Sequence, residues 1–237
     1  MSVYTVFLNF KWLLSINSIM IKVALLDDHP LIREGLKLIF SESKNIQVVY
    51  DSHDGYDFLS KIPHLDLDVA VLDIQMPIIN GFELCQAIKE KYPDVLVLFL
   101  SFLNPNACIE KVMELGANGF ISKNAPQHKL QEAILEVVEQ HFYFDLEFST
   151  VIEEASKWDQ KQPNSSSALP PALLSNREIE IISMIADEMS SKEIGDKLCI
   201  SLRTVEMHRR RIMEKTASKN FIGVIVYALK HKIIELN

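Results

Sequence analysis

Apolar runs and helix-period segments alternate between residues 20 and 141. The runs lie at 21–26, 47–50, 69–73, 95–100 and 119–121. Each is short and almost wholly apolar, which is typical of strands that are buried on both faces. Five such strands, each followed by a helical segment, predict a flavodoxin-like α/β domain with a five-stranded parallel sheet of order 2-1-3-4-5.

The segments between these runs carry apolar residues three and four positions apart, as one face of a helix does. They predict helices at 31–40, 56–62, 82–88, 106–115 and 130–138. Two of these helices are followed by stop signals. Gly116 suits the position after a helix end, and Pro93 cannot continue a helix.

From Leu174 onward the pattern is helical throughout. Capping residues open four helices: Ser175, Ser190, Ser201, and either Ser218 or Asn220. The first two have a glutamate three residues later, which completes a capping box. A short second helix, a tight turn at 199–200 and a basic third helix predict an all-α, four-helix helix-turn-helix domain. The third helix, 201–216, would then enter the major groove of DNA.

The angular positions along this third helix separate two faces. At about 100° per residue, Val205 and Ile212 fall together and are expected to face the core. The opposite face carries Arg203, Glu206, Met207, Arg210 and Glu214, with Arg211 nearby. Donors, an acceptor and an apolar tip on one face suit recognition of base edges. An ordinary solvated helix face is the alternative interpretation.

Between the two parts, residues 142–172 form a predicted linker. Its first half, Glu147 to Trp158, is compatible with a helix, and residues 160–167 are polar and rich in serine. Such a composition is typical of a flexible connection. The predicted organisation is therefore an α/β domain at 20–141, the linker at 142–172 and the helical domain at 173–237.

Residues 1–19 precede the first strand and are apolar but interrupted. Lys11 and several polar residues break the run, and no basic segment comes before it. A signal peptide and a membrane-spanning helix are both disfavoured, because the latter needs about 20 unbroken apolar residues. One interpretation is that the natural chain starts at Met20.

Composition adds a charge asymmetry. The 237 residues are 48% hydrophobic, which favours two compact units over a disordered chain. The net charge is −8, but residues 170–237 carry 11 Lys and Arg against 9 Asp and Glu. A basic C-terminal part suits a polyanionic partner and an acidic remainder suits a metal, although solvated faces would give the same balance.

The three cysteines indicate a reducing compartment. Cys85, Cys108 and Cys199 are far apart and lack CxxC spacing. They are expected to be reduced core thiols of a cytoplasmic protein, with neither a disulfide framework nor a zinc site.

Acidic and donor residues close several of the predicted strands. In the order 2-1-3-4-5, strands 1 and 3 are neighbours, so Asp27, Asp28 and Asp73 converge at one edge, with Ser101 and Lys123 on the same rim. Three close carboxylates repel one another unless a divalent cation lies between them, and hard oxygen ligands suit Mg²⁺. Taken alone, Asp73 could equally be a strand cap.

His29 follows the acid pair directly. It could be a further metal ligand, but a neutral turn residue is the favoured interpretation, because His29-Pro30 breaks away from the strand.

Three segments carry a specific family resemblance. "LLDDHPLIREGL", "VLDIQMPIINGFEL" and "GANGFISKNA" resemble the receiver domain of two-component response regulators. "LLSNREIEIISMIADEMSSKEIGDKLCISLRTVEMHRRRIMEK" resembles the LuxR-type DNA-binding domain. Together they are similar to the response regulators of the NarL/FixJ type, which implies transcription control rather than enzymatic turnover of a separate substrate.

The resemblance implies roles for the rim residues. Asp73 would be the phosphoacceptor, and Asp27, Asp28 and the backbone carbonyl of Gln75 would complete the Mg²⁺ site. Ser101 would sense the phosphoryl group, Lys123 would pair with it, and Phe120 would be the switch aromatic, with plain core filling as the alternative for Phe120. The receiver would catalyse only its own phosphotransfer and slow dephosphorylation.

The resemblance also implies partners. These are a sensor histidine kinase, double-stranded DNA, RNA polymerase and, when the protein is phosphorylated, a second copy of the chain. Helix 219–233 would join the DNA-binding domains of such a dimer, and no membrane contact is expected. Expected DNA-binding residues are Arg203, Glu206, Met207, Arg209, Arg210, Arg211 and Lys215. Arg210 and Met207 are expected over base edges. Arg203, Arg209 and Lys215 are expected on phosphates.

Some residues depart from the family pattern. Phe102 stands where a small residue is common, which puts access to Asp73 in doubt. Glu206 replaces a frequent lysine, and Met189 a more usual glycine.

Two other classes share some of these features. An aspartate-nucleophile phosphatase would have a second aspartate in the place of Gln75 as general acid, and a ligand-sensing LuxR protein would lack the acid pair.

Overall fold

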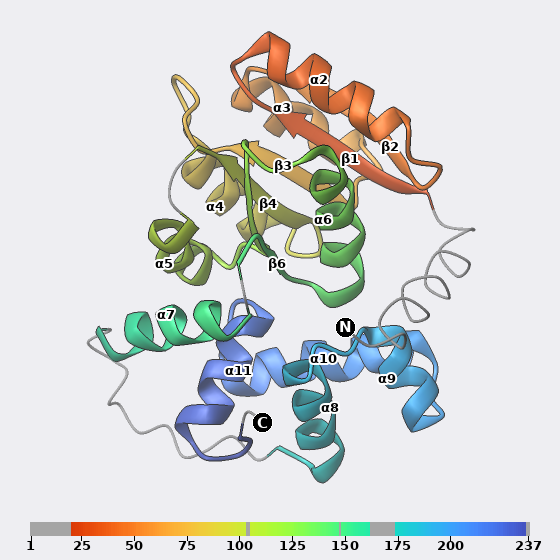
Figure 1. Ribbon diagram of the computed structural model, residues 1–237, viewed down its shortest axis with the longest axis vertical. Helices are drawn as coiled ribbons and strands as arrows, with labels where there is room; N and C mark the ends of the chain where they lie inside the picture. Colours follow the sequence, from red (N-terminus) through yellow and green to blue (C-terminus); the bar gives the residue numbers. More distant parts are fainter. Residues whose placement is uncertain (1–19, 103–104, 147, 162–173, 236–237) are drawn as a thin grey trace.

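A computed structural model describes residues 20–102, 105–146, 148–161 and 174–235. An α/β domain is joined through one helix to a bundle of four further helices (Figure 1). The predicted leader and most of the serine-rich linker segment lie outside the described residues. Within the described part, no helix is both long and apolar enough to cross a membrane.

The sheet of the α/β domain is parallel throughout. Its strands are β1 (Ile21–Leu26), β2 (Ile46–Ser52), β3 (Val69–Asp73), β4 (Leu96–Ser101), β5 (Gly119–Ser122) and β6 (Tyr143–Phe144). Their order is β2-β1-β3-β4-β5-β6. The flavodoxin-like prediction is therefore confirmed for the first five strands, and a sixth is added.

The sixth strand was missed because two residues are too few to show a periodic pattern. Strand β6 pairs with β5 in a register that places Tyr143 beside Gly119. A Cβ atom on Gly119 would lie 1.8 Å from the carbonyl oxygen of Tyr143, so the close approach requires glycine. The sheet thus runs past residue 141, where the sequence predicted the α/β domain to end.

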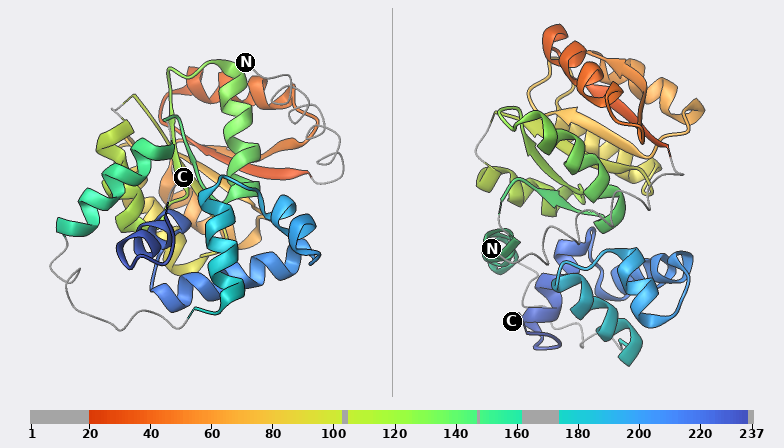
Figure 2. Two further views of the ribbon diagram at one scale, coloured as in Figure 1. Left: turned by 60° about the horizontal axis from the view of Figure 1, so that its bottom comes forward. Right: turned by 45° about the vertical axis from the view of Figure 1, so that its right-hand side comes forward.

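Helices cover both faces of this sheet (Figures 1 and 2). They are α2 (Pro30–Ser41), α3 (Gly55–Lys61), α4 (Gly81–Lys91), α5 (Pro105–Leu115) and α6 (Gln127–Gln140). A short 3-10 turn, η1 (Ile62–His64), follows α3. Helices α2 and α6 share one apolar core with the sheet, whereas α3, α4 and α5 share the other. The buried strands are apolar throughout because both faces are covered.

The C-terminal domain has the four predicted helices: α8 (Asn176–Ala186), α9 (Ser191–Leu198), α10 (Leu202–Thr216) and α11 (Phe221–Lys230). Ser175, Ser190 and Ser201 cap the first three as predicted. Asn220, not Ser218, caps the fourth by accepting from the backbone N–H of Gly223. Asn and Ser both suit the N-cap position, so only the geometry could separate them.

One cysteine prediction is wrong. Cys85 and Cys108 are buried, but Cys199 is exposed and ends α9 in the left-handed conformation, with φ 53°. The turn between α9 and α10 places this residue at the surface. It is therefore not a core thiol.

Helix α7 (Phe148–Lys161) lies in the predicted linker and joins the two domains. Its buried residues Val151, Ile152 and Ala155 belong to one apolar cluster with α5 and with the four C-terminal helices. It packs on both α5 and α11 (Figure 1). The helix suggested for residues 147–158 is thus observed, and it is an integral part of the core.

Candidate functional site

Acidic side chains gather at the carboxyl ends of β1 and β3. Asp27, Asp28, His29 and Asp73, called the acidic cluster below, each offer a ligand atom, and these atoms lie within 4.8 Å of one another. Asp27 and Asp73 are each only 1% exposed. The sequence predicted this convergence of the three aspartates from the strand order, because neighbouring parallel strands end at the same edge.

The backbone around Asp73 is closely packed. Gly81 begins α4 directly against it, and a Cβ atom at Gly81 would lie 2.3 Å from the carbonyl oxygen of Asp73. The Gln75 backbone N–H donates to Asp73 Oδ1 over 3.1 Å. The strand end and the following loop therefore hold the carboxyl group in one orientation.

Lys123 neutralises part of the acidic charge. Its Nζ lies 2.7 Å from Asp27 Oδ2 and 2.8 Å from Asp73 Oδ2. Burial raises the pKa of Asp73, and the nearby charge of Asp27 raises it further, whereas hydrogen bonds from Lys123 and the Gln75 N–H lower it. The net direction is upward, so the buried surroundings of Asp73 disfavour the charged form of its carboxyl group.

His29 lies closer to the carboxylates than the favoured interpretation implied. Its Nδ1 is 2.7 Å from Asp28 Oδ1 and 3.2 Å from Asp27 Oδ1. The backbone N–H of His29 also donates to Asp27 Oδ1. His29 is the residue directly before α2. The ring nitrogen is thus among the potential ligands. The remaining donors are carboxylate oxygens, which fit a hard divalent cation.

The other predicted rim residues come from β4 and β5. Ser101 is fully buried at the end of β4, and the backbone N–H of Lys123 donates to its carbonyl oxygen over 2.9 Å. Phe120 is fully buried in the core that α4 and α5 cover. Phe102 is 56% exposed, and Lys123 Nζ lies 5.5 Å from its ring centroid. An aromatic ring therefore covers one side of the lysine.

The third helix of the C-terminal domain, α10, turns its predicted core face inward. Val205 and Ile212 are both fully buried. The exposed residues on its opposite side include five that the sequence singled out: Arg203, Met207, Arg210, Arg211 and Glu214. The 100° periodicity separated the two faces, except that Glu206, which was expected on the exposed face, is half-buried.

Two of the predicted phosphate contacts have protein partners instead. Arg209 is 1% exposed, donates to the Gln140 carbonyl oxygen and to Ser191 Oγ, and lies 4.3 Å from the Phe221 ring centroid. Lys215 Nζ is 2.7 Å from Glu178 Oε2. Arg209 follows Val205 by four residues and precedes Ile212 by three, so its spacing already placed it on the buried face.

Both domains of the chain match families of known proteins. Residues 23–135 match the response regulator receiver domain, and residues 172–228 match the bacterial regulatory proteins of the luxR family. The chain is 33% identical over 216 residues to the oxygen regulatory protein NreC of Staphylococcus epidermidis, covering 90% of this chain and 99% of the relative. The chain belongs to the DNA-binding response regulators of the NarL/FixJ type.

Further relatives agree with this assignment. NreC of Staphylococcus aureus strain RF122 is 32% identical over 215 residues, which cover 90% of this response regulator and 99% of NreC. A solved complex of the response regulator RcsB with DNA has a TM-score of 0.51 at 23% identity and covers 89% and 98% of the two chains. At that identity the likeness supports the fold alone. The family membership decides against a phosphatase and a ligand-sensing LuxR protein.

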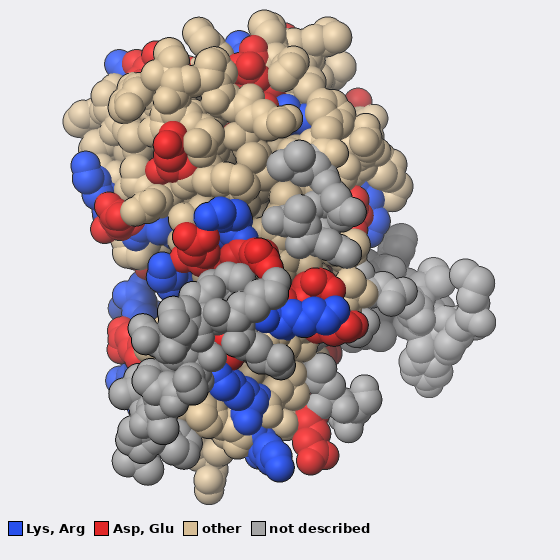
Figure 3. Space-filling model, turned by 90° about the vertical axis from the view of Figure 1, so that its left-hand side faces the viewer, with Lys and Arg blue, Asp and Glu red and all other residues tan. Residues whose placement is uncertain are grey.

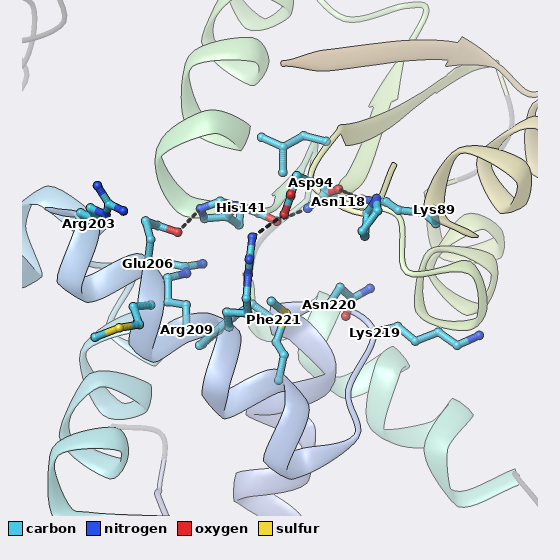
Figure 4. A pocket seen from close by; sticks show the side chains of 15 residues that line it. Lys89, Asp94, Asn118, His141, Arg203, Glu206, Arg209, Lys219, Asn220 and Phe221 are labelled. Carbon is cyan, nitrogen blue, oxygen red and sulfur yellow. Dashed lines mark hydrogen bonds and ion pairs between the residues drawn. The ribbon is translucent and has the colours of Figure 1, made fainter. Parts of the chain in front are cut away.

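In this response regulator the receiver contacts the DNA-binding helix α10. His141 Nε2 lies 2.7 Å from Glu206 Oε2, and Arg210 Nη2 lies 2.6 Å from Asp94 Oδ1 (Figure 4). The receiver therefore covers part of the surface that the sequence assigned to DNA.

Asn220 joins the two domains through buried hydrogen bonds. Its Nδ2 donates to the carbonyl oxygens of Val112 and Ala117, each over 3.1 Å. Nearby, Lys219 Nζ donates to the carbonyl oxygen of Glu114 over 2.7 Å. Sequence patterns could not reveal these partners, because they lie more than 100 positions apart in the chain.

Proposed function

We propose that Asp73 accepts a phosphoryl group from a sensor histidine kinase and that this modification controls DNA binding by the C-terminal domain. The observation that carries the proposal is the position of Lys123, whose Nζ lies within 2.8 Å of both Asp73 and the neighbouring Asp27. A buried cation beside a strand-end carboxylate suits a phosphoryl oxygen as its next partner.

The transfer needs few chemical groups. A carboxylate oxygen of Asp73 attacks the phosphorus of a phosphohistidine, the new O–P bond replaces the N–P bond, and the imidazole takes up a proton. Mg²⁺ held by Asp27, Asp28, Asp73 and the Gln75 carbonyl would neutralise the phosphoryl oxygens. His29 is close enough to orient Asp28. Exposed Gln75 supplies no general acid, so slow hydrolysis is expected.

Phosphorylation would act through β4 and α5. It adds about −1.5 to −2 charges at Asp73. The Ser101 hydroxyl and Lys123 are the donors that would bind the phosphoryl oxygens. Ser101 ends β4, and α5 follows it. The carbonyls of α5 and its following turn hold Asn220 of the DNA-binding domain. A shift of α5, accompanied by Phe120, would therefore loosen the contact between the domains.

Release of α10 would expose its DNA-binding surface. Met207 and Arg210 are placed to contact base edges, with Arg203 and Arg211 beside them for phosphates. Arg209 and Lys215 would join only after losing their present protein partners. A single helix-turn-helix buries little surface, so binding as a dimer to two half-sites is expected, with α11 as a contact region.

The proposed setting is the cytoplasm, where a kinase, DNA and RNA polymerase are all accessible. The RcsB–DNA complex supports the DNA contact, because its fold is that of this chain.

The direct test is to label the protein with acetyl phosphate and Mg²⁺ and to measure the intact mass. One added phosphoryl group is expected for the wild type and none for Asp73→Asn. Asp66→Asn is the matched control, since the Asp66 side chain is 83% exposed and outside the acidic cluster. Undiminished labelling of Asp73→Asn would remove the assignment.

A further inference from the structure

The end of α6 supplies two of the contacts that hold α10. The Gln140 carbonyl oxygen accepts from Arg209, and His141 Nε2 lies 2.7 Å from Glu206 Oε2. His141 ends the helix in the left-handed conformation, with φ 65°, which is uncommon for a residue other than glycine. Gln140 and His141 are called the docking turn below. The shape of its backbone decides where the Gln140 carbonyl group and the His141 ring point.

The contacts of the docking turn are more buried than another ion pair between the receiver and α10. Side chains of both charges are intermingled on the face of the protein that Figure 3 shows, and exposed ion pairs contribute little to stability. Arg210 and Asp94 form such a pair, with side chains 65% and 81% exposed. Arg209 is fully buried, and His141 and Glu206 are half-buried. Of these two contact regions, the docking turn is therefore expected to hold α10 more firmly.

One buried amide fixes the docking turn from inside the receiver. Asn118, directly before β5, is 7% exposed. Its Nδ2 donates to the His141 carbonyl oxygen over 2.8 Å. Its Oδ1 accepts from the Val97 backbone N–H over 3.0 Å and from Lys89 Nζ over 2.8 Å. The side chain thus joins the docking turn to β4 and α4, and Figure 4 shows it between His141 and Lys89.

Lys89 determines which way this amide faces. Its Nζ donates to the Val95 carbonyl oxygen over 2.9 Å as well as to Asn118 Oδ1. A lysine ammonium group and a backbone N–H only donate hydrogen bonds. Asn118 must therefore turn its oxygen toward Lys89 and the Val97 N–H, which leaves its NH₂ group for the His141 carbonyl oxygen.

The same lysine lies on a helix that begins beside Asp73. Helix α4 starts at Gly81, where a Cβ atom would lie 2.3 Å from the Asp73 carbonyl oxygen. A displacement of this strand end would be passed to α4, because the two backbones are in contact. A cavity of about 360 Å³ borders Lys89, Asn118 and His141, so the docking turn has room to move.

We propose that Asn118, oriented by Lys89, is a positioning residue that holds the docking turn in the shape that binds α10. Through α4, Asp73 then has a route to α10 that is separate from the one through α5 and Asn220. This route rests on the proposed function, whereas the positioning of the docking turn does not.

Asn118→Asp in the full-length, unphosphorylated protein tests the proposal. The carboxylate keeps an acceptor for Lys89 and the Val97 N–H but sets its other oxygen against the His141 carbonyl oxygen. The domains are expected to separate, which small-angle X-ray scattering measures as a larger radius of gyration. DNA affinity should rise about tenfold, as the loss of one buried hydrogen bond implies. An unchanged radius of gyration would overturn the proposal. Separated domains with unchanged DNA affinity would support it and contradict the proposed function instead.

Lys89→Met is the second variant, because it removes the charged partner of Asn118 but no contact with the DNA-binding domain. It should also enlarge the radius of gyration, although less than Asn118→Asp does. Lys91→Met, at an exposed position of the same helix, is the matched control and should scatter like the wild type. If Lys89→Met and Lys91→Met scatter alike, Lys89 does not orient the amide and the proposal fails.

Two further readouts separate positioning from a general loss of structure. Asp73 in Asn118→Asp should still be labelled by acetyl phosphate and Mg²⁺ as in the wild type, because the acidic cluster is unaltered. In an Asn220→Asp background, Asn118→Asp should add little to DNA affinity, since the domains are already apart. Fully additive gains would overturn the positioning role.

Discussion

Glu206, on the helix expected to enter the major groove, accepts a hydrogen bond from His141 of the receiver over 2.7 Å. Glu206 departs from the family pattern, and His141 lies at the end of α6 in the receiver. This one contact therefore joins the two domains. Glu206 is one of the residues predicted to contact DNA, so the receiver covers a predicted DNA-binding residue.

Acidification should open this contact. Burial and the charge of Arg209 lower the pKa of His141 below its usual 6.5, although Glu206 opposes them, and Lys89 adds a further lowering effect. His141 therefore binds a proton more tightly when the DNA-binding domain is separated from the receiver than when the two domains are in contact. The contact between the domains should weaken as the pH falls below about 6.5. The pKa of Glu206 is lowered too, which acts in the same direction at still lower pH.

The measurement compares DNA affinity of unphosphorylated protein at pH 7.5 and pH 6.0. His141→Asn keeps an N–H donor but does not titrate, so its gain on acidification should be smaller than that of the wild type. A larger gain for His141→Asn would show that protonated His141 strengthens docking instead.

Asn220→Asp should separate the domains while preserving α11. The carboxylate can still accept from the Gly223 N–H at the helix N-terminus, but it cannot donate to the carbonyls of Val112 and Ala117. Losing buried donors costs about 1–3 kcal/mol, so DNA affinity without phosphorylation should rise about tenfold. Asn220→Ala, which also loses the cap, should lower the melting temperature as well. Unchanged DNA affinity of Asn220→Asp would contradict the role of this contact.

Glu206→Lys should strengthen DNA binding through two effects. It removes the partner of His141 and places a second cation beside Arg209, so the docked arrangement weakens. It also adds a phosphate contact, which should steepen the salt dependence of binding by about one charge. Glu206→Gln should also weaken the contact with His141, to a smaller extent, but it adds no phosphate contact. Measuring the DNA affinity of both variants at two salt concentrations separates the two effects. An identical salt dependence of DNA affinity for both variants would place residue 206 away from the DNA backbone.

Gly119→Ala should destabilise the receiver by displacing β6. The added Cβ would lie 1.8 Å from the Tyr143 carbonyl oxygen, whereas at Gly35 it would meet no atom within 4 Å. Gly35→Ala, in the middle of α2, should instead stabilise by roughly 0.5–1 kcal/mol. Thermal melting of the two variants gives opposite expected shifts. A Gly119→Ala protein as stable as the wild type would mean that β6 is not firmly paired.

Local patterns predicted most of the fold. Strand β3 ends at Asp73 as its apolar run indicates, and Ser175 and Ser190 cap their helices because capping boxes need only four consecutive residues. Convergence of Asp27 with Asp73 followed from strand order alone. These features depend on neighbouring residues or on general topological rules.

The domain contact could not be predicted in the same way. Arg209 carries a charge that suggested DNA, and only its spacing from Val205 hinted at burial. Its acceptor is a backbone carbonyl at Gln140, which has no sequence signature. Asp94 lies in a loop and His141 at a helix end. Their ion pairs with α10 form only when the DNA-binding domain packs on the receiver. Charge type was a weaker guide than position on the helix.

The most direct measurement of the central claim is DNA affinity of the full-length protein before and after acetyl phosphate treatment with Mg²⁺. The account predicts that phosphorylated wild type binds DNA more tightly than unmodified wild type, whereas Asp73→Asn does not respond. Asn220→Asp should bind tightly before treatment and gain little from it, because its domains are already separated. An equal gain for Asp73→Asn, or a phosphorylated wild type with unchanged affinity, would contradict the account.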